Sequence, residues 1–513
     1  MRDYKQFIFY QIYPKSFCDS NGDGFGDLQG IRQKADYLQG LGVNAVWITP
    51  CFASPGVDNG YDISDYMQID EKMGTMADME ALIASLHKRG IAVILDFVVN
   101  HTSTAHEWFA KSRKSKDNPY RDYYIWRETP PNDWQSVFGG SAWQQDVQTG
   151  EYYLHSFAIE QADLNWENAK VRQEMCDVVD FWVKKGVDGF RIDVLDMISK
   201  DWAGNKNGNG PHLQAYIRQL FDRENTRELF TVGECWSADI QTAKDFSDGG
   251  RYGLKCVFAF QHLCVEEGKF ALKKPKLSTL CARISAWQTA MQAQGVLPTL
   301  FLENHDQPRS VTRFGNDENL RYESATLLGA LVLLHRGIPF LYQGQEIGLT
   351  NNKGEKIEDF NDVEAHIFYR QNEGELSKNE RIARINYGGR DNARYMLPWT
   401  SKRQKSWTLP YYKAKEINVE KDARTDKSVA EFYRQLIALR KKEKSLYDGN
   451  YVKIDLTEKY YIFERRSEDE RIRVVCNFQE ETPYAGKTGR ILLNNYAQFD
   501  GILRPFQVLV CKL

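Results

Sequence analysis

The sequence predicts a (β/α)8 barrel with a small domain inserted after strand three and an antiparallel β-domain at the C-terminal end. Short apolar runs alternate with amphipathic stretches along most of the chain, and such alternation favours a parallel sheet closed by helices. Beyond about residue 446 the hydrophobic period changes to two, which is typical of antiparallel strands. The eight predicted barrel strands are Phe7–Tyr13, Ala45–Thr49, Ala92–Val99, Gly189–Val194, Leu229–Glu234, Lys255–Phe260, Thr299–Glu303 and Pro339–Tyr342.

Helical patterns separate these strands, and glycines mark several of their ends. Gly42, Gly90 and Gly186 each stand shortly before the next strand, where a helix commonly ends in a left-handed residue. The clearest helical patterns are Met76–Lys88, Ala169–Lys185, Tyr322–Leu334 and a closing helix, Ser428–Lys441.

Two stretches interrupt the alternation. At 513 residues the chain is too long for one compact core, so two or three domains are expected. Residues 102–168 are rich in Trp, Tyr, Pro, Asp and Gly and are too long for a plain loop, which predicts an inserted subdomain B. Residues 350–410 form a second, polar insertion after strand eight. The barrel is therefore predicted over 1–101 and 169–445, with the β-domain over 446–513.

Composition excludes several classes of partner. The net charge of −3 gives no reason to expect nucleic acid or an anionic membrane, and no apolar run is long enough to span a bilayer. The nine cysteines are scattered without a C-x-x-C pair, which indicates neither a zinc site nor a disulfide framework. We expect a cytoplasmic protein, a monomer or weak homo-oligomer, acting on a small molecule.

Three acidic residues stand where predicted strands end: Asp193, Glu234 and Asp306. Each alone is better explained by a helix cap or a rim ion pair, but the three together favour a site, because the carboxyl ends of parallel strands meet at one rim of a barrel. Arg191 lies two residues before Asp193 on the same face of its strand, so it is expected to keep that carboxylate ionised and to aim it. Two carboxylates that flank a glycosidic bond are what glycoside hydrolysis requires.

At these residues the chain resembles the α-amylase family of retaining glycoside hydrolases, glycoside hydrolase family 13. The stretches that resemble the family's four signature motifs, in the family's order, are Asp96–His101, Gly189–Val194, Gly233–Glu234 and Glu303–Asp306. Gln161–Trp166 resembles a fifth motif, QPDLNW, of the oligo-1,6-glucosidase and α-glucosidase branch, with Ala162 in place of proline. Gly389–Arg394 also resembles that branch.

The resemblance implies roles for the residues at the barrel rim. Asp193 would be the nucleophile and Glu234 the general acid and then the base. The apolar neighbours Val232 and Trp236 also predict a raised pKa for Glu234, which suits a general acid. Asp306 would bind sugar hydroxyls and stabilise the transition state, helped by His101 and His305, while Arg191 would hold Asp193.

The same resemblance implies a pocket closed at one end. Asp58 and Arg390 would bind the non-reducing end of the sugar, with Arg394 as the alternative to Arg390, and Tyr61 would stack on the ring. Such a pocket favours exo-action.

Two stretches bear on the choice of substrate. In this branch a valine after the nucleophile, here Val194, goes with α-1,6 linkages, because a β-branched side chain narrows the entry to the next subsite. Tyr395–Trp399 departs from the TPMQW-like run of relatives, so the preference for the aglycone stays open.

The stretch Asp19–Asp27 has the pattern of a calcium loop, with oxygen-bearing residues at alternate positions and glycines for the tight turn. It lacks the closing glutamate of an EF-hand, since its twelfth position is Gly30. The resemblance implies a structural Ca²⁺ and no catalytic cofactor. The implied ligands are the side chains of Asp19, Asn21, Asp23 and Asp27 and the carbonyl of Phe25.

Three functional hypotheses follow. The first is an exo-acting α-glucosidase that cleaves α-1,6 linkages in isomaltose and short isomalto-oligosaccharides. The second keeps the fold but changes the substrate: an α-1,4-glucosidase, a sucrase, a dextran glucosidase or a trehalose-6-phosphate hydrolase. The third is a catalytically silent barrel that acts as a binding subunit, which would require the loss of the catalytic carboxylates and usually a membrane anchor.

Overall fold

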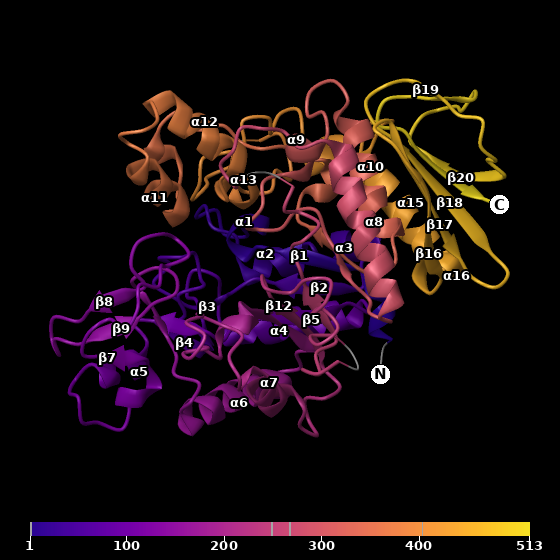
Figure 1. The fold of residues 1–513 in the computed structure, drawn as a ribbon. Helices are drawn as coiled ribbons and strands as arrows, with labels where there is room; N and C mark the ends of the chain where they lie inside the picture. Colours follow the sequence, from indigo (N-terminus) through magenta and orange to yellow (C-terminus); the bar gives the residue numbers. More distant parts are fainter. Residues whose placement is uncertain (1–2, 248–249, 266–267, 403) are drawn as a thin grey trace.

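The structure, a computed structural model, describes residues 3–247, 250–265, 268–402 and 404–513, and its central feature is an eight-stranded parallel sheet (Figure 1). The strand order is β13-β12-β11-β5-β2-β1-β15-β14, and every ladder within it is parallel. The eight predicted strands are confirmed as β1 (Phe9–Ile12), β2 (Ala45–Ile48), β5 (Ala92–Val98), β11 (Gly189–Asp193), β12 (Phe230–Glu234), β13 (Cys256–Phe258), β14 (Thr299–Leu300) and β15 (Ile338–Tyr342).

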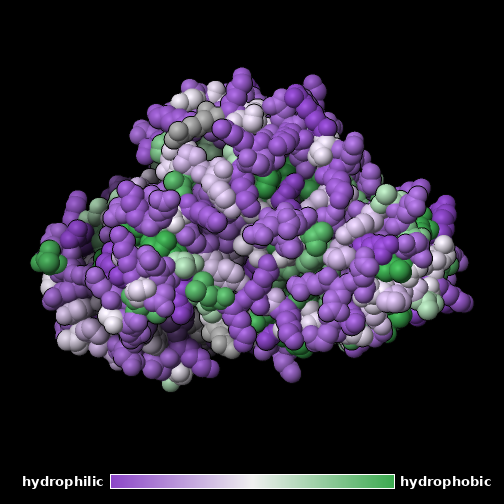
Figure 2. Space-filling model, turned by 90° about the horizontal axis from the view of Figure 1, so that it is seen from above, coloured by the Kyte–Doolittle hydropathy of each residue, from purple (hydrophilic) through white to green (hydrophobic). Residues whose placement is uncertain are grey.

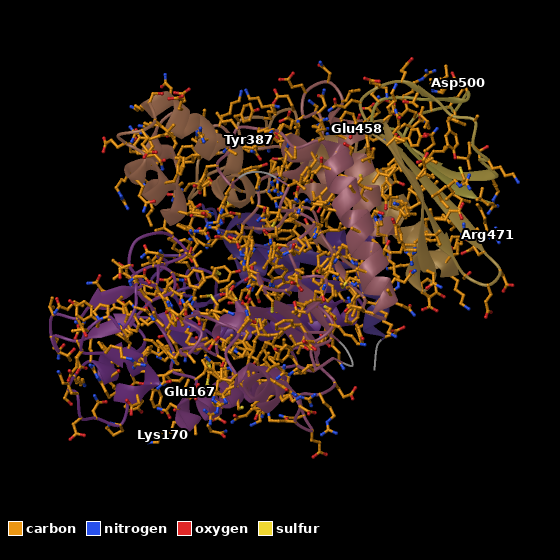
Figure 3. All side chains as sticks on the ribbon, in the orientation of Figure 1. Glu167, Lys170, Tyr387, Glu458, Arg471 and Asp500 are labelled. Carbon is orange, nitrogen blue, oxygen red and sulfur yellow. The ribbon has the colours of Figure 1, made fainter. Side chains whose placement is uncertain are left out.

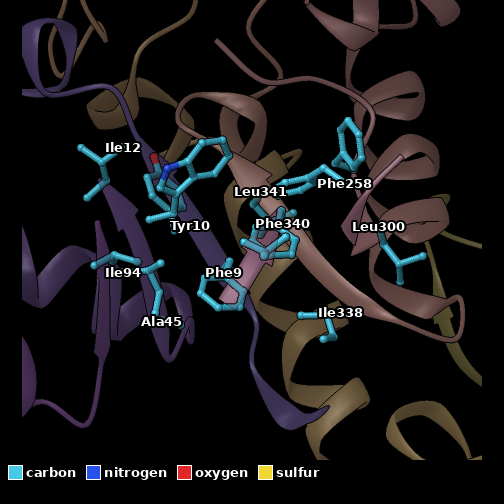
Figure 4. Packing of buried hydrophobic residues seen from close by; sticks show 14 of the residues in the cluster. Phe9, Tyr10, Ile12, Ala45, Ile94, Phe258, Leu300, Ile338, Phe340 and Leu341 are labelled. Atoms are coloured by element: carbon cyan, nitrogen blue, oxygen red, sulfur yellow. The ribbon is translucent and has the colours of Figure 1, made fainter. Parts of the chain in front are cut away.

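The sheet closes into a barrel between its two edge strands. The Thr299 hydroxyl of β14 donates a hydrogen bond of 3.0 Å to the carbonyl of Val257 in β13. Aromatic rings fill the interior, where Phe9 and Phe340 stack at 4.3 Å between centroids and Phe258 packs edge-on against Phe340 at 4.6 Å (Figure 4). The barrel is therefore a packed core, and ligands must bind at its rim.

The predicted helices are also present. They surround the barrel together with several shorter helices, and Gly42, Gly90 and Gly186 have left-handed φ values of 96°, 75° and 96° at the helix ends. Around the barrel lie α1 (Pro14–Phe17), α2 (Leu28–Gln33), α3 (Ala35–Leu41), α4 (Met76–Lys88), α6 (Ala169–Lys184), α7 (Leu213–Phe221), α8 (Leu277–Ala293), α9 (Ser310–Phe314), α10 (Arg321–Leu334), α14 (Val419–Asp422), α15 (Val429–Lys442) and α16 (Lys444–Tyr447).

The segment 102–168 folds beside the barrel around its own small cluster of buried residues, which includes Ile125, Trp143 and Leu154. One helix in it, α5, was not predicted, because six residues are too few to show a helical period. The elements of the segment and its attachment are β6 (His101–Ser103), α5 (Glu107–Ser112), β7 (Trp126–Arg127), β8 (Trp143–Gln145), β9 (Tyr152–Leu154) and β10 (Gln161–Asp163). A further small pair, β3 (Phe52–Ala53) with β4 (Asp65–Ile69), precedes α4.

The segment 350–410 contains helices that the sequence did not reveal. These are α11 (Val363–Gln371), α12 (Lys378–Gly388) and α13 (Asp391–Arg394). Their small core, built on Phe360, Ile382 and Ile385, uses too few apolar residues to give a clear pattern. In Figure 1 these helices and the segment 102–168 lie on the same side of the barrel.

The C-terminal part is an antiparallel sheet, as predicted, on the side of the barrel away from α11 and α12 (Figure 1). Arg471 and Asp500 mark it in Figure 3, far from Tyr387 of α12. Its strands are β16 (Asn450–Leu456), β17 (Tyr460–Arg466), β18 (Arg471–Asn477), β20 (Arg490–Asn494) and β22 (Val508–Lys512), with a small pair, β19 (Thr482–Pro483) and β21 (Ile502–Leu503).

The surface is mainly hydrophilic on the face shown in Figure 2, where hydrophobic residues occur in small scattered groups. In the described part of the chain, no helix combines the length and the apolar character that crossing a membrane requires.

A buried ion pair ties the segment 102–168 to the barrel. The Lys200 ammonium donates to Asp163 of β10 at 2.7 Å and to the side-chain oxygen of Asn100, after β5, at 3.0 Å. Lys200 and Asp163 are 5% and 0% exposed. Removing one partner of a buried ion pair leaves the charge of the other uncompensated, which strongly destabilises the fold.

We therefore expect Lys200→Met to lower the free energy of unfolding by about 3 kcal/mol. The melting temperature should fall by several degrees in differential scanning calorimetry. Lys184→Met, which removes an exposed lysine of α6, is the matched control and should leave the melting temperature unchanged. A Lys200→Met protein that melts with the parent would contradict this account.

Candidate active site

The ends of β11 and β12 and the loop after β14 meet at one cavity of about 650 Å³. Its wall also includes Phe138 and Phe157 from the segment 102–168, and Glu364 and Tyr387 from α11 and α12. Eight of the predicted catalytic and substrate-binding residues line it: Asp58, Tyr61, His101, Asp193, Val194, Glu234, Asp306 and Arg390. The other two, Arg191 and His305, lie beneath it and contact its lining residues.

One arginine joins the carboxylates at the strand ends. Arg191 donates through Nη1 to Asp193 at 2.6 Å and to Asp96 at 2.9 Å, and its Nη2 lies 2.6 Å from Oε2 of Glu234. The guanidinium is 1% exposed. The contact between Arg191 and Asp193 agrees with the sequence prediction, whereas the contacts to Asp96 and Glu234 were not foreseen.

Arg191 favours the ionised form of Asp193, as expected from the sequence, but burial acts in the opposite direction. Burial raises the pKa of Asp193 well above its usual range and also raises the pKa of Glu234, while Arg191 opposes both shifts. The pKa values stay raised despite Arg191 because a single guanidinium contacts three buried carboxylates, whose negative charges repel one another. The cluster therefore holds a proton more strongly than an isolated carboxyl group, and its members titrate as a set.

Each of the two cavity carboxylates keeps one oxygen free. Asp193 uses Oδ1 for Arg191, and Glu234 uses Oε2 for Arg191 and for the Val194 N–H at 3.3 Å. Among the described residues no hydrogen bond reaches Oδ2 of Asp193 or Oε1 of Glu234. These two oxygens are available to a ligand in the cavity.

Backbone strain accompanies this arrangement. Val194 has φ 35° and ψ 48°, in the left-handed region that β-branched residues rarely adopt. Such a conformation costs about 1–3 kcal/mol and persists only when the surroundings enforce it. Here it turns the Val194 N–H toward Glu234 and places the side chain in the cavity wall.

Asp306 faces a set of positive and hydrogen-bonding groups. Arg394 Nη2 donates to it at 2.6 Å, Arg390 Nη1 at 3.3 Å, and His305 Nε2 lies 3.0 Å away. Burial acts to raise the pKa of Asp306, but His305, Arg394 and Arg390 hold it well below its usual range. Asp306 is therefore an ionised carboxylate, in contrast to the Arg191 cluster.

Asp58 and Arg390 lie together in the cavity wall. Arg390 contacts Asp58 at 3.2 Å and donates to Asp362 at 2.6 Å, and its guanidinium lies 5.0 Å from the ring centre of Phe138. Burial raises the pKa of Asp58 to about 6, with Arg390 and Arg394 acting in the opposite direction. Of the two arginines weighed from sequence, Arg390 contacts Asp58, and both contact Asp306.

The two predicted histidines are buried, and His305 is held in one orientation. Its Nε2 lies 2.6 Å from the Tyr61 hydroxyl and near the acceptor Asp306, while Gln11 reaches Nδ1 at 2.8 Å. Because a carboxylate only accepts, Nε2 carries the proton and Nδ1 accepts from the Gln11 amide. Burial lowers the pKa of His101 to about 4, so this ring is neutral.

Tyr61 is anchored rather than free. Its hydroxyl donates to Asp96 at 2.9 Å, and its ring stacks on His305 at 5.3 Å with an angle of 5° between the planes. Only 6% of the residue is exposed, on the cavity side.

The Asp19–Asp27 loop offers an oxygen-rich set for a hard cation. Asp19, Asn21 and Asp23 turn side-chain oxygens toward loop N–H groups, as in the bond of 2.8 Å from Phe25 N–H to Asp23. Asp27 fits less well, because it caps α2 through Gly30 and accepts from Ser20. No group of three His, Cys, Asp or Glu arranged for a metal exists within the described ranges, so the ligand set stays a prediction.

Several residues in the cavity wall or directly behind it were missed as site residues from sequence. Asp362 caps α11 within the polar segment 350–410 and has no distinguishing motif. Lys269 and Glu364 form an ion pair in the cavity wall. Trp236, 51% exposed, stacks on Phe260 at 3.9 Å and 3°. An aromatic two residues after a strand-end glutamate was the only signal available for this platform.

A parallel barrel whose mouth holds two buried carboxylates on one guanidinium, beside an open cavity, defines a glycoside hydrolase type of site. Comparison with known proteins agrees with this class of enzyme. The family model for the alpha-amylase catalytic domain matches residues 11–449. The chain belongs to the alpha-amylase family of glycoside hydrolases, as the sequence motifs predicted.

The similar proteins resemble the chain over its whole length. It is 41% identical to the oligo-1,6-glucosidase of Parageobacillus thermoglucosidasius, with 99% of both chains covered. It is 40% identical to the glucan 1,6-alpha-glucosidase of Streptococcus pneumoniae serotype 4, covering 96% of this chain and 94% of that one. The trehalose-6-phosphate hydrolase TreA of Bacillus licheniformis has a similar structure, with a TM-score of 0.91 at 37% identity over 99% of each chain.

The pKa of Asp58 predicts a pH dependence of sugar binding. Below about pH 6 the carboxyl is protonated and loses its charged contact with Arg390, so the dissociation constant for glucose should fall as the pH rises through about 6. Calorimetric titration with glucose between about pH 5 and about pH 8 measures this, because the ligand itself stays neutral. Asp58→Asn should bind about tenfold more weakly and without this step. If Asp58→Asn showed the same change in dissociation constant near pH 6 as the parent, Asp58 would not be the group responsible.

Proposed function

We propose that the protein is a retaining, exo-acting α-glucosidase that releases terminal α-1,6-linked glucose from isomaltose and short isomalto-oligosaccharides. The observation that carries this proposal is the pair Asp193 and Glu234, held by one guanidinium and each presenting a free oxygen to the cavity.

The chemistry follows from these two oxygens. Asp193 Oδ2 attacks the anomeric carbon while the proton held by the cluster, on Oε1 of Glu234, passes to the leaving oxygen. Glu234 then removes a proton from water, which displaces Asp193 and gives glucose with its original α-configuration. Because the same guanidinium binds both carboxylates, their separation suits a retaining pair better than an inverting pair.

Exo-action is supported by the cluster of charged groups at one end of the cavity. Asp58, Arg390 and Asp306 crowd that end with charged hydrogen-bonding groups suited to the hydroxyls of one terminal glucose. His101 and Tyr61 complete the wall. The cavity wall also carries the exposed Trp236, a flat face suited to a second sugar.

The α-1,6 preference rests on Val194 and on the relatives named above, and a neutral sugar is favoured over a phosphorylated one. Of the three cations in the described cavity wall, Lys269 is paired with Glu364, and Arg390 is paired with Asp362 and Asp58. The third, Arg313, donates to Gln307 and to the carbonyl of Leu263. A phosphate would have to compete with these partners. Trehalose-6-phosphate hydrolysis, the activity named for the similar Bacillus licheniformis protein, is for this reason the second candidate.

Two further properties belong to the proposal. A structural Ca²⁺ is expected in the Asp19–Asp27 loop, where it would join Asp19, Asn21 and Asp23 and add no catalytic chemistry. A cytoplasmic location, with the chain a monomer or a weak homo-oligomer, is supported by nine free cysteines, of which all but Cys264 are buried.

The proposed reaction predicts both stereochemistry and substrate rank. An NMR time course should show α-glucose first, with β-glucose appearing only by mutarotation. Initial rates on isomaltose, panose, maltose, sucrose and trehalose 6-phosphate should be highest for isomaltose. Asp193→Ala should lose about four orders of magnitude on an aryl α-glucoside. Full activity of that variant would instead support a binding protein, and β-glucose first would exclude retention.

Val194→Ala tests the linkage preference separately. Removing the branched side chain should lower the ratio of isomaltose to maltose rates by about tenfold, because methyl-scale changes alter discrimination to that degree. Val194→Ile is the matched control that keeps the branch. Equal rates of the parent on both disaccharides would remove the linkage argument while leaving the retaining mechanism intact.

Calcium binding predicts a stability effect. If Ca²⁺ occupies the loop, added EGTA should lower the melting temperature by several degrees, and excess Ca²⁺ should restore it. Asp19→Asn with Asp23→Asn should melt at the lower temperature with or without EGTA. The same melting temperature for the parent in Ca²⁺ and in EGTA would dismiss the site.

A further inference from the structure

Two side chains outside the sugar cavity, Lys15 and Trp407, connect a surface loop to the part of the pocket formed by Asp58 and Tyr61. Lys15 lies in α1, and Trp407 lies at the end of the segment 350–410. Neither lines the cavity. Lys15 contacts Asn59, which adjoins the cavity residue Asp58 in the sequence. Trp407 reaches the cavity indirectly, because it packs on Tyr13, which packs on His305 beneath the cavity wall.

Trp407 belongs to a column of stacked rings that ends in the pocket wall. Phe25 stacks on Trp407 at 6.3 Å and 13°, and Trp407 stacks on Tyr13 at 6.4 Å and 26°. Tyr13 stacks on His305 at 6.1 Å and 24°, and His305 stacks on Tyr61 at 5.3 Å and 5°. Offset stacking of this kind fixes ring planes relative to one another.

Trp407 is itself held on several sides. Its indole N–H donates to the Ser16 hydroxyl at 3.1 Å, and its backbone N–H donates to the Gly24 carbonyl at 3.0 Å. The Lys15 ammonium lies 4.1 Å from its ring centre. A ring with these restraints can support Tyr13, and through it His305, from behind.

Lys15 makes the second connection. Its ammonium donates to the side-chain oxygen of Asn59 at 2.9 Å. Asn59 is 8% exposed and has φ 54°, a left-handed conformation that needs support from its surroundings. It separates Asp58 from the turn that delivers Tyr61, so the position of Asn59 determines where both pocket side chains stand.

We propose that Lys15 and Trp407 are positioning residues for sugar binding: Lys15 fixes the Asp58–Tyr61 turn through Asn59, and Trp407 supports His305 and Tyr61 through the ring column. The inference rests on the proposed function, since it concerns the glucose-binding end of the same cavity. Neither residue touches the substrate, and neither moves a proton.

The test compares substitutions at these two residues with matched substitutions at a similar pair nearby. The control pair is Lys34 and Trp399, whose ammonium and ring centre lie 4.2 Å apart. Trp399 packs edge-on against Phe17 and Tyr37, and neither member of the pair is among the described residues that line the cavity. The variants are Lys15→Met, Trp407→Leu, Lys34→Met and Trp399→Leu, with Lys15→Arg and Trp407→Phe as conservative replacements. The readouts are kcat and KM on an aryl α-glucoside and the calorimetric dissociation constant for glucose.

Lys15→Met and Trp407→Leu should each raise KM and the glucose dissociation constant about tenfold while kcat stays within about threefold, because they weaken ground-state and transition-state binding alike. Lys15→Arg and Trp407→Phe should recover most of the affinity. Lys34→Met and Trp399→Leu should leave both constants unchanged, even where Trp399→Leu lowers the melting temperature.

The inference would be overturned if Lys15→Met and Trp407→Leu left KM and the glucose affinity unchanged. It would also be overturned if the control variants lost as much affinity as these two. If either of the larger changes prevents folding, Lys15→Arg and Trp407→Phe decide the matter through the glucose dissociation constant. Failure of the parent to hydrolyse the glucoside would refute the proposed function instead, and the glucose titrations would still report on the positioning role.

Discussion

The contact between Arg191 and three carboxylates is the interaction on which the site depends. It brings Asp96 of β5, Asp193 of β11 and Glu234 of β12 to one guanidinium, although these residues are far apart in the sequence. Burying such a cluster is unfavourable, because one positive charge cannot compensate three negative ones. The barrel supplies the rigid frame that makes it possible, and the surplus negative charge makes a shared proton available for acid catalysis.

The remainder of the pocket balances charge differently. Asp306 meets Arg390, Arg394 and His305, so burial does not protonate it. The two environments suit different tasks. The Arg191 cluster can hold a transferable proton, whereas the ionised Asp306 can stabilise positive charge at the anomeric centre. The segment 350–410 is essential to this contrast, because it carries both arginines. An insertion that interrupts the barrel pattern therefore completes its active site.

The sequence was most informative where burial is continuous. Each barrel strand is an apolar run, and a run that ends in Asp193 or Glu234 predicts a rim carboxylate without knowledge of the fold. The helices α11 and α12 escaped because a handful of apolar residues holds them. Asp362 escaped because an acidic residue in a polar segment has no signature. The raised pKa of Glu234 agrees with the prediction from its apolar neighbours, whereas the raised pKa of Asp193 escaped because it depends on contacts between strands.

The central claim is that Asp193 is the group that bonds to the sugar. Incubation with 5-fluoro-α-glucosyl fluoride, followed by peptide mass spectrometry, tests it most directly, because a slowed second step lets a covalent intermediate accumulate. The account predicts one fluoroglucosyl group on Asp193, with Glu234 and Asp306 unmodified. A label on Glu234 or Asp306, or turnover with no covalent adduct at any time, would contradict it.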